Sequence, residues 1–183
     1  MPIAVIETAR LQMRPFALGD LDDLHRLFTD PGVRRYLLDD QVVGREWVEE
    51  EIAGSLGRFE MHDGGLWSVS LKGDGALAGF CGYRPFHDPP ELQLLYGLAP
   101  TYWGRGLATE AARAMIRYGF EELGFTRIVA SADAPNAASL RVMERAGLTF
   151  AKRVTVNGLD TVYYARARAL YRPDDAFYAV RPG

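Results

Sequence analysis

A glycine-rich loop followed by a helix is the segment of this 183-residue sequence that is best suited to bind an anion. Residues 98–110 (LAPTYWGRGLATE) read as a strand end, a loop and a helix start. The first turn of a helix has amide groups without intrahelical partners and carries partial positive charge. Gly104 and Gly106 lack Cβ atoms, so these amides can approach an anion closely, and Arg105 adds a cation. This combination suits a pyrophosphate.

The loop alone leaves more than one interpretation open. It could be a plain glycine-rich turn or the loop of a dinucleotide fold. A dinucleotide fingerprint, G-x-G-x-x-G/A, needs glycine or alanine at the position of Thr109, and the sequence has no Walker A lysine pattern. The first observation speaks against a nicotinamide-dependent reductase, which stays open as an alternative, and the second speaks against a P-loop nucleotide site.

A third interpretation rests on a resemblance to a known family. Residues 102–111 (YWGRGLATEA) resemble the coenzyme loop of GNAT acetyltransferases, in the form found in ribosomal-protein N-terminal acetyltransferases. Residues 8–16 (TARLQMRPF) are similar to the first strand of that branch. Residues 136–148 (NAASLRVMERAGL) resemble its N-x-x-S segment and the glycine that follows. The resemblance covers nearly the whole chain, with the motifs in the order of the family.

The resemblance implies an N-acetyltransferase that transfers the acetyl group of acetyl-CoA to a primary amine by direct attack in a ternary complex. The acceptor would be an amine-bearing small molecule or the N-terminus of a peptide or protein. The pantetheine arm would follow Leu98 and Ala99, where two strands splay apart, and Asn136 would contact it. The pyrophosphate would lie on the amides of Trp103, Gly104, Arg105, Gly106, Leu107, Ala108 and Thr109.

Ser139 is the candidate for assisting the departure of coenzyme A. In the resemblance it lies near the thioester sulfur, where a hydroxyl could donate a hydrogen bond or a proton to the leaving thiolate. The alternative is a hydroxyl that caps amides at a helix start. A backbone N–H of Leu98 or Ala99 would stabilise the developing oxyanion.

Two departures from the family pattern affect the acid and the base. Met143 stands where many members have a tyrosine acid, and a thioether donates no proton. Gln93 stands where the branch often has a glutamate, and a neutral amide is not a base at pH 7. Glu91 projects from the same strand face and could replace that glutamate, directly or through water. A solvated role for Glu91, or His87 as the base, are the alternatives.

These departures bear on the function. They keep open an acyl-CoA-binding or sensing module without efficient catalysis. Gln93 also favours an α-amine acceptor, because the pKa of an α-amine lies near 8 whereas that of a lysine amine lies near 10.4, so a weak base suffices.

The elements that position these residues follow from the apolar pattern. Helical spacing predicts a long helix over 109–123 and a shorter one over 139–146. Alternation predicts a strand over 66–71, and an apolar run predicts another over 76–84. A third strand is expected over 91–99, and Asn157-Gly158 predicts a hairpin. The order of elements indicates a single α/β domain with a mixed central sheet and a parallel crossover through 109–123. The resemblance implies splayed strands flanked by helices, an acetyltransferase domain over residues 1–171, and a C-terminal tail over 172–183.

The amino-acid composition limits the classes of partner and cofactor that we expect for this protein. The net charge is −3, so a globally basic nucleic-acid binder is disfavoured, and 48% hydrophobic residues indicate a folded domain. Cys81 is the only cysteine, which excludes a disulfide framework or a multi-cysteine metal site. No apolar run is long enough for a bilayer or a signal peptide. We therefore expect a cytoplasmic enzyme, monomeric or homodimeric, that uses acetyl-CoA and no metal.

Overall fold

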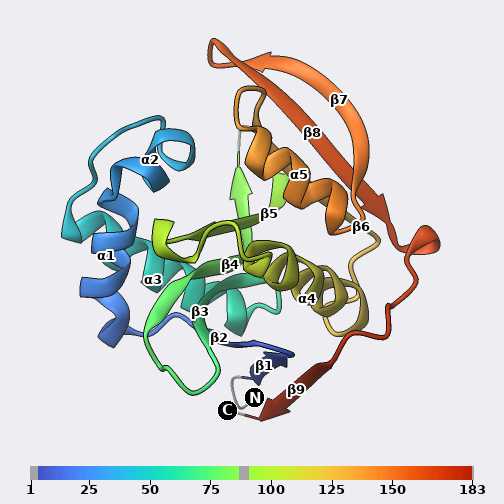
Figure 1. Ribbon diagram of the computed structural model, residues 1–183, viewed down its shortest axis with the longest axis horizontal. Helices are drawn as coiled ribbons and strands as arrows, with labels where there is room; N and C mark the ends of the chain where they lie inside the picture. Colours follow the sequence, from blue (N-terminus) through green and yellow to red (C-terminus); the bar gives the residue numbers. More distant parts are fainter. Residues whose placement is uncertain (1–3, 87–90, 183) are drawn as a thin grey trace.

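Two antiparallel sheets form the centre of the fold in this computed structural model, which describes residues 4–86 and 91–182 (Figure 1). His87, a candidate base from the sequence, lies outside the described residues. The predicted α/β class is confirmed, and so is the splay of strands.

The larger sheet has the strand order β5-β4-β3-β2-β1-β9, and every neighbouring pair is antiparallel. Its strands are β1 (Ala4–Thr8), β2 (Leu11–Pro15), β3 (Gly65–Leu71), β4 (Leu77–Phe86), β5 (Glu91–Leu98) and β9 (Tyr178–Pro182). Strand β2 alternates between buried and exposed residues, as a strand covered on one face does. Strands β3 and β4 are mostly buried on both faces, which is consistent with helices on either side.

The segment expected to be a C-terminal tail takes part in this sheet. Strand β9 pairs with β1 along its full length, from Ala4 opposite Pro182 to Thr8 opposite Tyr178. It is the last strand of the sheet on the side opposite β5. A domain boundary at residue 171 stays a prediction, and the structure ties the residues after it to β1.

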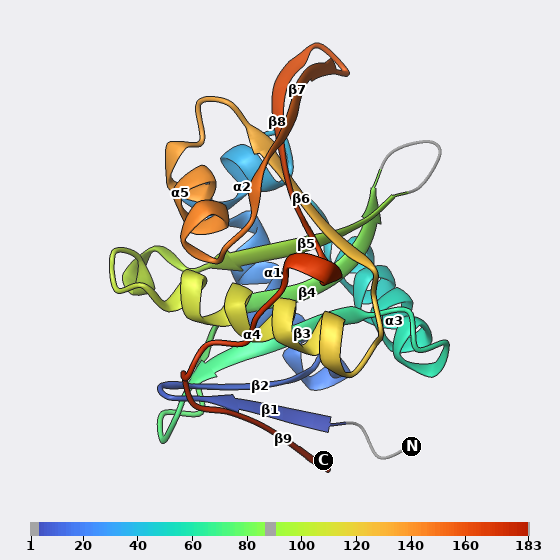
Figure 2. The ribbon, with the colours of Figure 1, turned by 90° about the vertical axis from the view of Figure 1, so that its right-hand side faces the viewer.

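The smaller sheet has the order β6-β8-β7, with β6 (Arg127–Asp133), β7 (Thr149–Val156) and β8 (Leu159–Ala167). Strands β7 and β8 are joined by Asn157 and Gly158, which both have positive φ, at 49° and 80°. A two-residue type I′ turn requires this backbone, so the predicted hairpin is confirmed. The hairpin projects from the body of the protein (Figure 2).

Strands β5 and β6 contact each other but belong to different sheets. The sequence predicted a parallel crossover within one mixed sheet, whereas every strand pair of the described residues is antiparallel. The two sheets diverge at this point, so the backbone of β5 that faces β6 is left for other partners. The antiparallel sheets also contradict the dinucleotide-fold alternative, which needs a parallel sheet.

Helix α4 (Leu107–Glu121) and helix α5 (Ala137–Arg145) flank this junction. Both begin two residues before the predicted helices at 109 and 139. The N-cap residues Gly106 and Asn136 explain the difference, because each lets the helix begin directly after its loop. Helix α4 lies along one face of the larger sheet (Figure 2).

Three helices lie between β2 and β3: α1 (Leu21–Thr29), α2 (Pro31–Leu37) and α3 (Arg45–Glu60). The apolar spacing of residues 21–28 and 47–56 predicts only two helices in this segment, with Pro31 closing the first. Helix α1 does end before Pro31, but this proline then begins α2. Asp30 caps α2 by accepting the amides of Gly32 and Val33, and proline fits a first helical turn because it has no N–H to satisfy.

The apolar core lies on both faces of the larger sheet. One cluster joins α4 to the face that carries Leu94 and Leu98. A second cluster packs α1, α2 and α3 against the opposite face, which carries Phe80 and Leu95. The end of β5 is thus held from both sides. Among the described residues, no helix is both long and apolar enough to cross a bilayer.

Candidate active site

A cleft of about 540 Å³ opens where β5 and β6 diverge. The end of β5, the loop before α4, the first turns of α4 and α5, and helix α2 all line it. Of the residues proposed from the sequence, those that line the cleft are Leu98, Trp103, Gly104, Gly106, Leu107, Ala108, Thr109, Asn136 and Ser139. Ala99, Arg105 and Glu91 do not line it.

The loop before α4 has the backbone of an anion site. Gly104 and Gly106 have φ of 71° and 74°, a conformation that L-residues adopt only with strain. The first intrahelical bond runs from the Glu110 amide to the Gly106 carbonyl, at 3.1 Å. The amides of Leu107, Ala108 and Thr109 precede it, and Gly106 as N-cap has no side chain to accept them. They are available to an anion in the cleft.

Trp103 connects this loop to two other elements. Its indole Nε1 donates to the Leu98 carbonyl at 2.7 Å. Its ring also lies against α2, since a Cβ at Gly32 would meet that ring at 2.9 Å. The side chain is 51% exposed, so one part of the indole packs and another faces the cleft. Trp103 thus fixes the loop relative to β5 and α2.

The end of β5 offers one free backbone N–H and not two. The Ala99 amide donates to the Ala78 carbonyl at 2.9 Å, so it is used within the larger sheet. Successive residues of an antiparallel strand direct their amides to opposite sides. The Leu98 amide therefore points away from β4, toward the divergence, and is the better placed of the two to meet an oxyanion.

Ser139 does not cap its own helix. Asn136 is the N-cap of α5, and its Oδ1 accepts the Ser139 amide at 3.2 Å. The Ser139 hydroxyl instead lies 2.9 Å from the hydroxyl of Tyr96 on β5. The Tyr96 hydroxyl also lies 3.0 Å from the Ser139 carbonyl, to which it donates. These bonds join β5 to α5 across the cleft.

Tyr96 is a functional candidate that sequence reasoning missed. Burial raises the pKa of its phenol well above the ordinary value, and the hydrogen bond with Ser139 offsets this only in part. The phenol therefore stays protonated at physiological pH. The signal in the sequence was its place on β5, with Leu94 and Leu98 on the same strand face.

A second polar chain crosses the junction near the start of β5. Gln93, 2% exposed, accepts the Ser131 hydroxyl at its Oε1 at 2.6 Å. Its Nε2 donates to the Glu91 carboxylate at 3.3 Å. A carboxylate only accepts, so Glu91 fixes which way the Gln93 amide points. Ser131 must then donate to Gln93, which leaves the lone pairs of its hydroxyl unused by Gln93, and Ser131 also lines the cleft.

The chain was compared with known proteins. Residues 10–149 match the family described as the acetyltransferase (GNAT) domain. The chain belongs to this acetyltransferase family. The resemblance stated from the sequence is therefore confirmed, and so is the enzyme class. Members of the family use acetyl-CoA.

Two relatives and one solved structure are similar to this chain. The Bacillus subtilis (strain 168) protein named "Uncharacterized protein YkkB" is 36% identical over 132 residues, covering 70% of this chain and 74% of its own. Spermidine N(1)-acetyltransferase of Escherichia coli (strain K12) is 25% identical over 147 residues, 76% and 73% of the two chains. The fold is shared with a Salmonella typhimurium acetyl transferase described as modifying the N-terminal serine of ribosomal protein L7/L12. That structure has a TM-score of 0.72 and 19% identity, covering 87% of this chain and 96% of its own.

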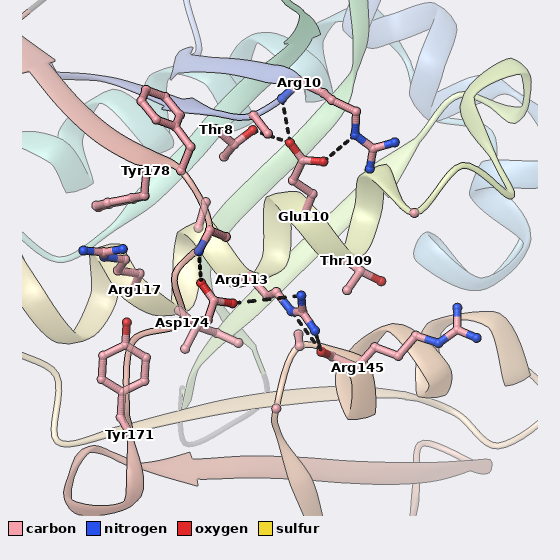
Figure 3. Close-up of a pocket in the computed structure, with 18 of the residues that line it drawn as sticks. Thr8, Arg10, Thr109, Glu110, Arg113, Arg117, Arg145, Tyr171, Asp174 and Tyr178 are labelled. Atoms are coloured by element: carbon pink, nitrogen blue, oxygen red, sulfur yellow. Dashed lines mark hydrogen bonds and ion pairs between the residues drawn. The ribbon is translucent and has the colours of Figure 1, made fainter.

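A carboxylate brace holds the loop before α4 of this acetyltransferase (Figure 3). Glu110 in the first turn of α4 accepts the Thr8 hydroxyl at 2.6 Å, the Arg10 amide at 2.8 Å and the Arg10 Nε at 2.7 Å. Arg10 in turn donates to the Arg105 carbonyl at 2.9 Å. Burial alone would raise the pKa of Glu110, but the bonds from Thr8 and Arg10 outweigh it and lower that pKa.

A second cavity of about 360 Å³ lies beside this brace, between α4, the end of α5 and the segment before β9. Figure 3 shows Arg113 between Asp174 and the end of α5, where its Nε and Nη2 donate to the Arg145 carbonyl at 3.0 and 2.7 Å. The charged residues that line the cavity are Arg10, Glu110, Arg113, Arg117, Arg145, Arg166, Arg172 and Asp174. Arginines outnumber acids, so the cavity is cationic, and it adjoins the cleft at Gly106, Thr109 and Arg145.

Two further residues that the sequence analysis considered, Met143 and Glu91, do not line the cleft. Met143 is 1% exposed in the core, so it does not face the cleft. Glu91 lies five residues from Tyr96, or about 17 Å along an extended strand, and reaches the junction only through Gln93. Among the described residues, no cluster of three or more His, Cys, Asp or Glu could hold a metal ion.

Proposed function

We propose that this acetyltransferase transfers the acetyl group of acetyl-CoA to a primary amine, and that it favours the α-amine at the N-terminus of a peptide or protein. The observation that carries the proposal is the loop before α4, whose unpaired amides open into the same cleft as Ser139 and the free edge of β5. An anion site, an oxyanion donor and a donor for a leaving group are what acetyl transfer from a coenzyme thioester needs.

The groups of acetyl-CoA fit the residues present. In our proposal, the pyrophosphate lies on the amides of residues 103–109, with Arg105 as a nearby cation. The pantetheine arm follows Leu98, with Ala99 holding that strand end to β4. Asn136 uses its Oδ1 to cap α5, so its Nδ2 is the group that is left to meet the pantetheine arm.

The cationic cavity beside the loop suits the third phosphate of coenzyme A. Arg145 lines both the cavity and the cleft, and its guanidinium forms no hydrogen bond or ion pair with the described residues. Arg113 is already bound to the Arg145 carbonyl. We therefore assign Arg145 as the guanidinium that meets this phosphate.

The proposed chemistry is a direct transfer. The amine nitrogen forms a bond to the thioester carbon, the carbon–sulfur bond breaks, and the sulfur leaves with its electron pair. The Leu98 N–H stabilises the oxygen that becomes negative, as preorganised backbone donors do. Ser139 supplies a hydrogen bond to the departing sulfur.

The acceptor amine is placed by the chain of Ser131, Gln93 and Glu91. Because Ser131 donates its proton to Gln93, its lone pairs are free to accept an N–H of the amine. An amide side chain does not carry a proton onward, so Glu91 takes the amine proton only through water. This is a weak base arrangement and supports an acceptor that is partly neutral at pH 7, as an α-amine is.

The relatives support a primary amine without deciding which. The name of one gives spermidine, and the description of another gives an N-terminal serine. We place the enzyme in the cytoplasm, as a monomer or homodimer, on the grounds of its sequence. The alternative is an acyl-CoA-binding or sensing module that keeps the loop but does not turn over efficiently, which Gln93 and Met143 favour.

Thermal unfolding with added ligand tests the coenzyme part of this proposal. Acetyl-CoA or coenzyme A at 100 times its Kd should stabilise the protein by about 2.7 kcal/mol and raise Tm by roughly 5–11 °C. NADPH should leave Tm unchanged. A rise in Tm with NADPH and not with coenzyme A would contradict the coenzyme A site. A rise with coenzyme A but no acetylation of any amine in a panel would favour the binding module.

A further inference from the structure

The Tyr96 hydroxyl has two possible acceptors on the same residue. It lies 3.0 Å from the Ser139 carbonyl and 2.9 Å from the Ser139 hydroxyl. Both distances are those of good hydrogen bonds. The two contacts connect β5 to α5 at the wall of the cleft that both side chains line.

The number of hydroxyl protons determines which residue donates each of these two hydrogen bonds. A phenol has one proton, and a carbonyl only accepts. When Tyr96 donates to the Ser139 carbonyl, the 2.9 Å contact requires that Ser139 donates its own hydroxyl proton to Tyr96. In this arrangement Ser139 has no proton left for a sulfur atom in the cleft. The arrangement is therefore a resting one.

We propose that Tyr96 is a positioning residue that switches Ser139 between this resting arrangement and a donating one. In the donating arrangement, the Tyr96 proton turns from the Ser139 carbonyl to the Ser139 hydroxyl oxygen. The Ser139 O–H is then free to donate a hydrogen bond to the departing sulfur. The switch needs only rotation of two O–H bonds, since the oxygens already lie at hydrogen-bond distance. No proton is transferred between residues, so no charge is left on either one.

The surroundings of Tyr96 support this role. The ring packs against the cluster that joins α4 to the larger sheet, so the hydroxyl is held in place. The protonated phenol is the form the switch requires, and burial keeps it so. This inference rests on the proposed function, because it assigns Ser139 to the sulfur of coenzyme A.

A purely structural role for Tyr96 makes different predictions. If Tyr96 only anchored α5 to β5, its loss would lower stability and leave the chemical step alone. Tyr83 offers a matched control, since its buried phenol donates to the Met115 carbonyl at 2.7 Å and lines no part of the cleft. Tyr83→Phe therefore removes the same kind of bond between a strand and a helix.

The test compares kcat and the KM for acetyl-CoA in wild type, Tyr96→Phe, Ser139→Ala, the double variant and Tyr83→Phe. We expect Ser139→Ala to lower kcat by about 100-fold and Tyr96→Phe by about tenfold, with KM little changed. The double variant should be no slower than Ser139→Ala, because Tyr96 acts through Ser139. Tyr83→Phe should lower Tm without changing kcat. A Tyr96→Phe enzyme with the kcat of wild type would overturn the proposal. So would a double variant whose loss of kcat equals the product of the losses in the two single variants.

A second readout keeps the inference testable apart from turnover. The pKa of the coenzyme A thiol, titrated in the complex by thiolate absorbance, should be lower in wild type than in Tyr96→Phe. If wild type binds coenzyme A but acetylates no amine, the proposed function fails and this titration alone decides the role of Tyr96. Equal thiol pKa values in the two proteins would overturn that role, even where turnover is intact. A wild type that binds no coenzyme A overturns both proposals.

Discussion

The Glu110 carboxylate accepts the Arg10 Nε–H at 2.7 Å, which ties the first turn of α4 to the turn between β1 and β2. Arg10 also donates to the carbonyl of Arg105, within the loop before α4. The shape of the loop thus depends on a turn about 100 residues earlier in the chain. Coenzyme binding and stability should respond together when this pair is changed.

Glu110→Gln is expected to weaken both properties. The amide oxygen can still accept the Thr8 hydroxyl and the Arg10 amide, but the group that accepted the Arg10 Nε–H is replaced by a neutral donor. We expect a loss of about 1 kcal/mol in the free energy of unfolding, less than for a buried charged hydrogen bond, because Arg10 is half exposed. The Kd of acetyl-CoA should rise as well. Glu60→Gln, at the exposed end of α3, is the control and should change neither.

The contribution of Glu110 to the free energy of unfolding should depend on pH in a defined direction. The pKa of Glu110 is lowered in the folded protein, so its contribution to stability is present above its ordinary pKa and is lost as pH falls through the lowered value. The difference in unfolding free energy between wild type and Glu110→Gln should be full above about pH 5 and shrink in more acidic solution. A difference that grows on acidification would contradict the assignment.

Gly106→Ala tests the backbone of the anion site. An added Cβ would meet nothing closer than Arg10 Nη2 at 3.6 Å, so space is available and only the positive φ opposes it. Strain of about 1–2 kcal/mol should displace the amides of the first turn and raise the Kd of acetyl-CoA by about tenfold.

Gly54→Ala is the control for this change. Gly54 lies in the exposed interior of α3, without positive φ and with nothing near an added Cβ. That substitution should stabilise the protein by about 0.5–1 kcal/mol and leave coenzyme binding unchanged. Equal affinity for acetyl-CoA in wild type and Gly106→Ala would mean that the loop amides do not bind the coenzyme.

Arg145→Gln should affect only coenzymes that carry the third phosphate. We expect the Kd of coenzyme A to rise by about tenfold, and that of 3′-dephospho-coenzyme A to stay unchanged, because only the former has the group that Arg145 would meet. Calorimetry with both ligands measures this. Arg26→Gln, on α1, serves as the control. An equal rise in the Kd of both ligands would show that Arg145 does not contact the third phosphate.

The pH dependence of turnover should separate the acceptor classes. With a peptide N-terminus, the rate should level off above about pH 8, where the α-amine is neutral. With a lysine side chain in an N-terminally blocked peptide, it should keep rising by about tenfold per pH unit up to about pH 10. At pH 7 the free N-terminus should therefore react faster. A preference for the blocked lysine peptide at pH 7 would refute an α-amine acceptor.

Local signals in the sequence predicted the parts of the site that are local in the fold. The glycines of the loop, the helix after it and the Asn157-Gly158 turn each depend on neighbouring residues, and the structure has all three. Helix α2 was missed because it is short and begins at Pro31, which also ends α1.

The parts of the site that the sequence did not predict depend on contacts between residues far apart in the chain. Tyr96 and Ser139 are 43 residues apart, and Glu110 is 102 residues from Thr8. No periodicity encodes such a pair, so neither the switch nor the brace could be predicted. Ala99 and Leu98 looked equivalent as donors, and only the register with Ala78 distinguishes them.

The most direct test of the central claim is a reaction of the purified protein with acetyl-CoA and a peptide that has a free N-terminus. Released coenzyme A thiol and acetylated peptide are measured in the same samples, by absorbance and mass spectrometry. We expect the two products in equal amounts, and neither when the N-terminus is blocked. Release of thiol without acetylated peptide, or no product with any primary amine, would contradict an amine acetyltransferase.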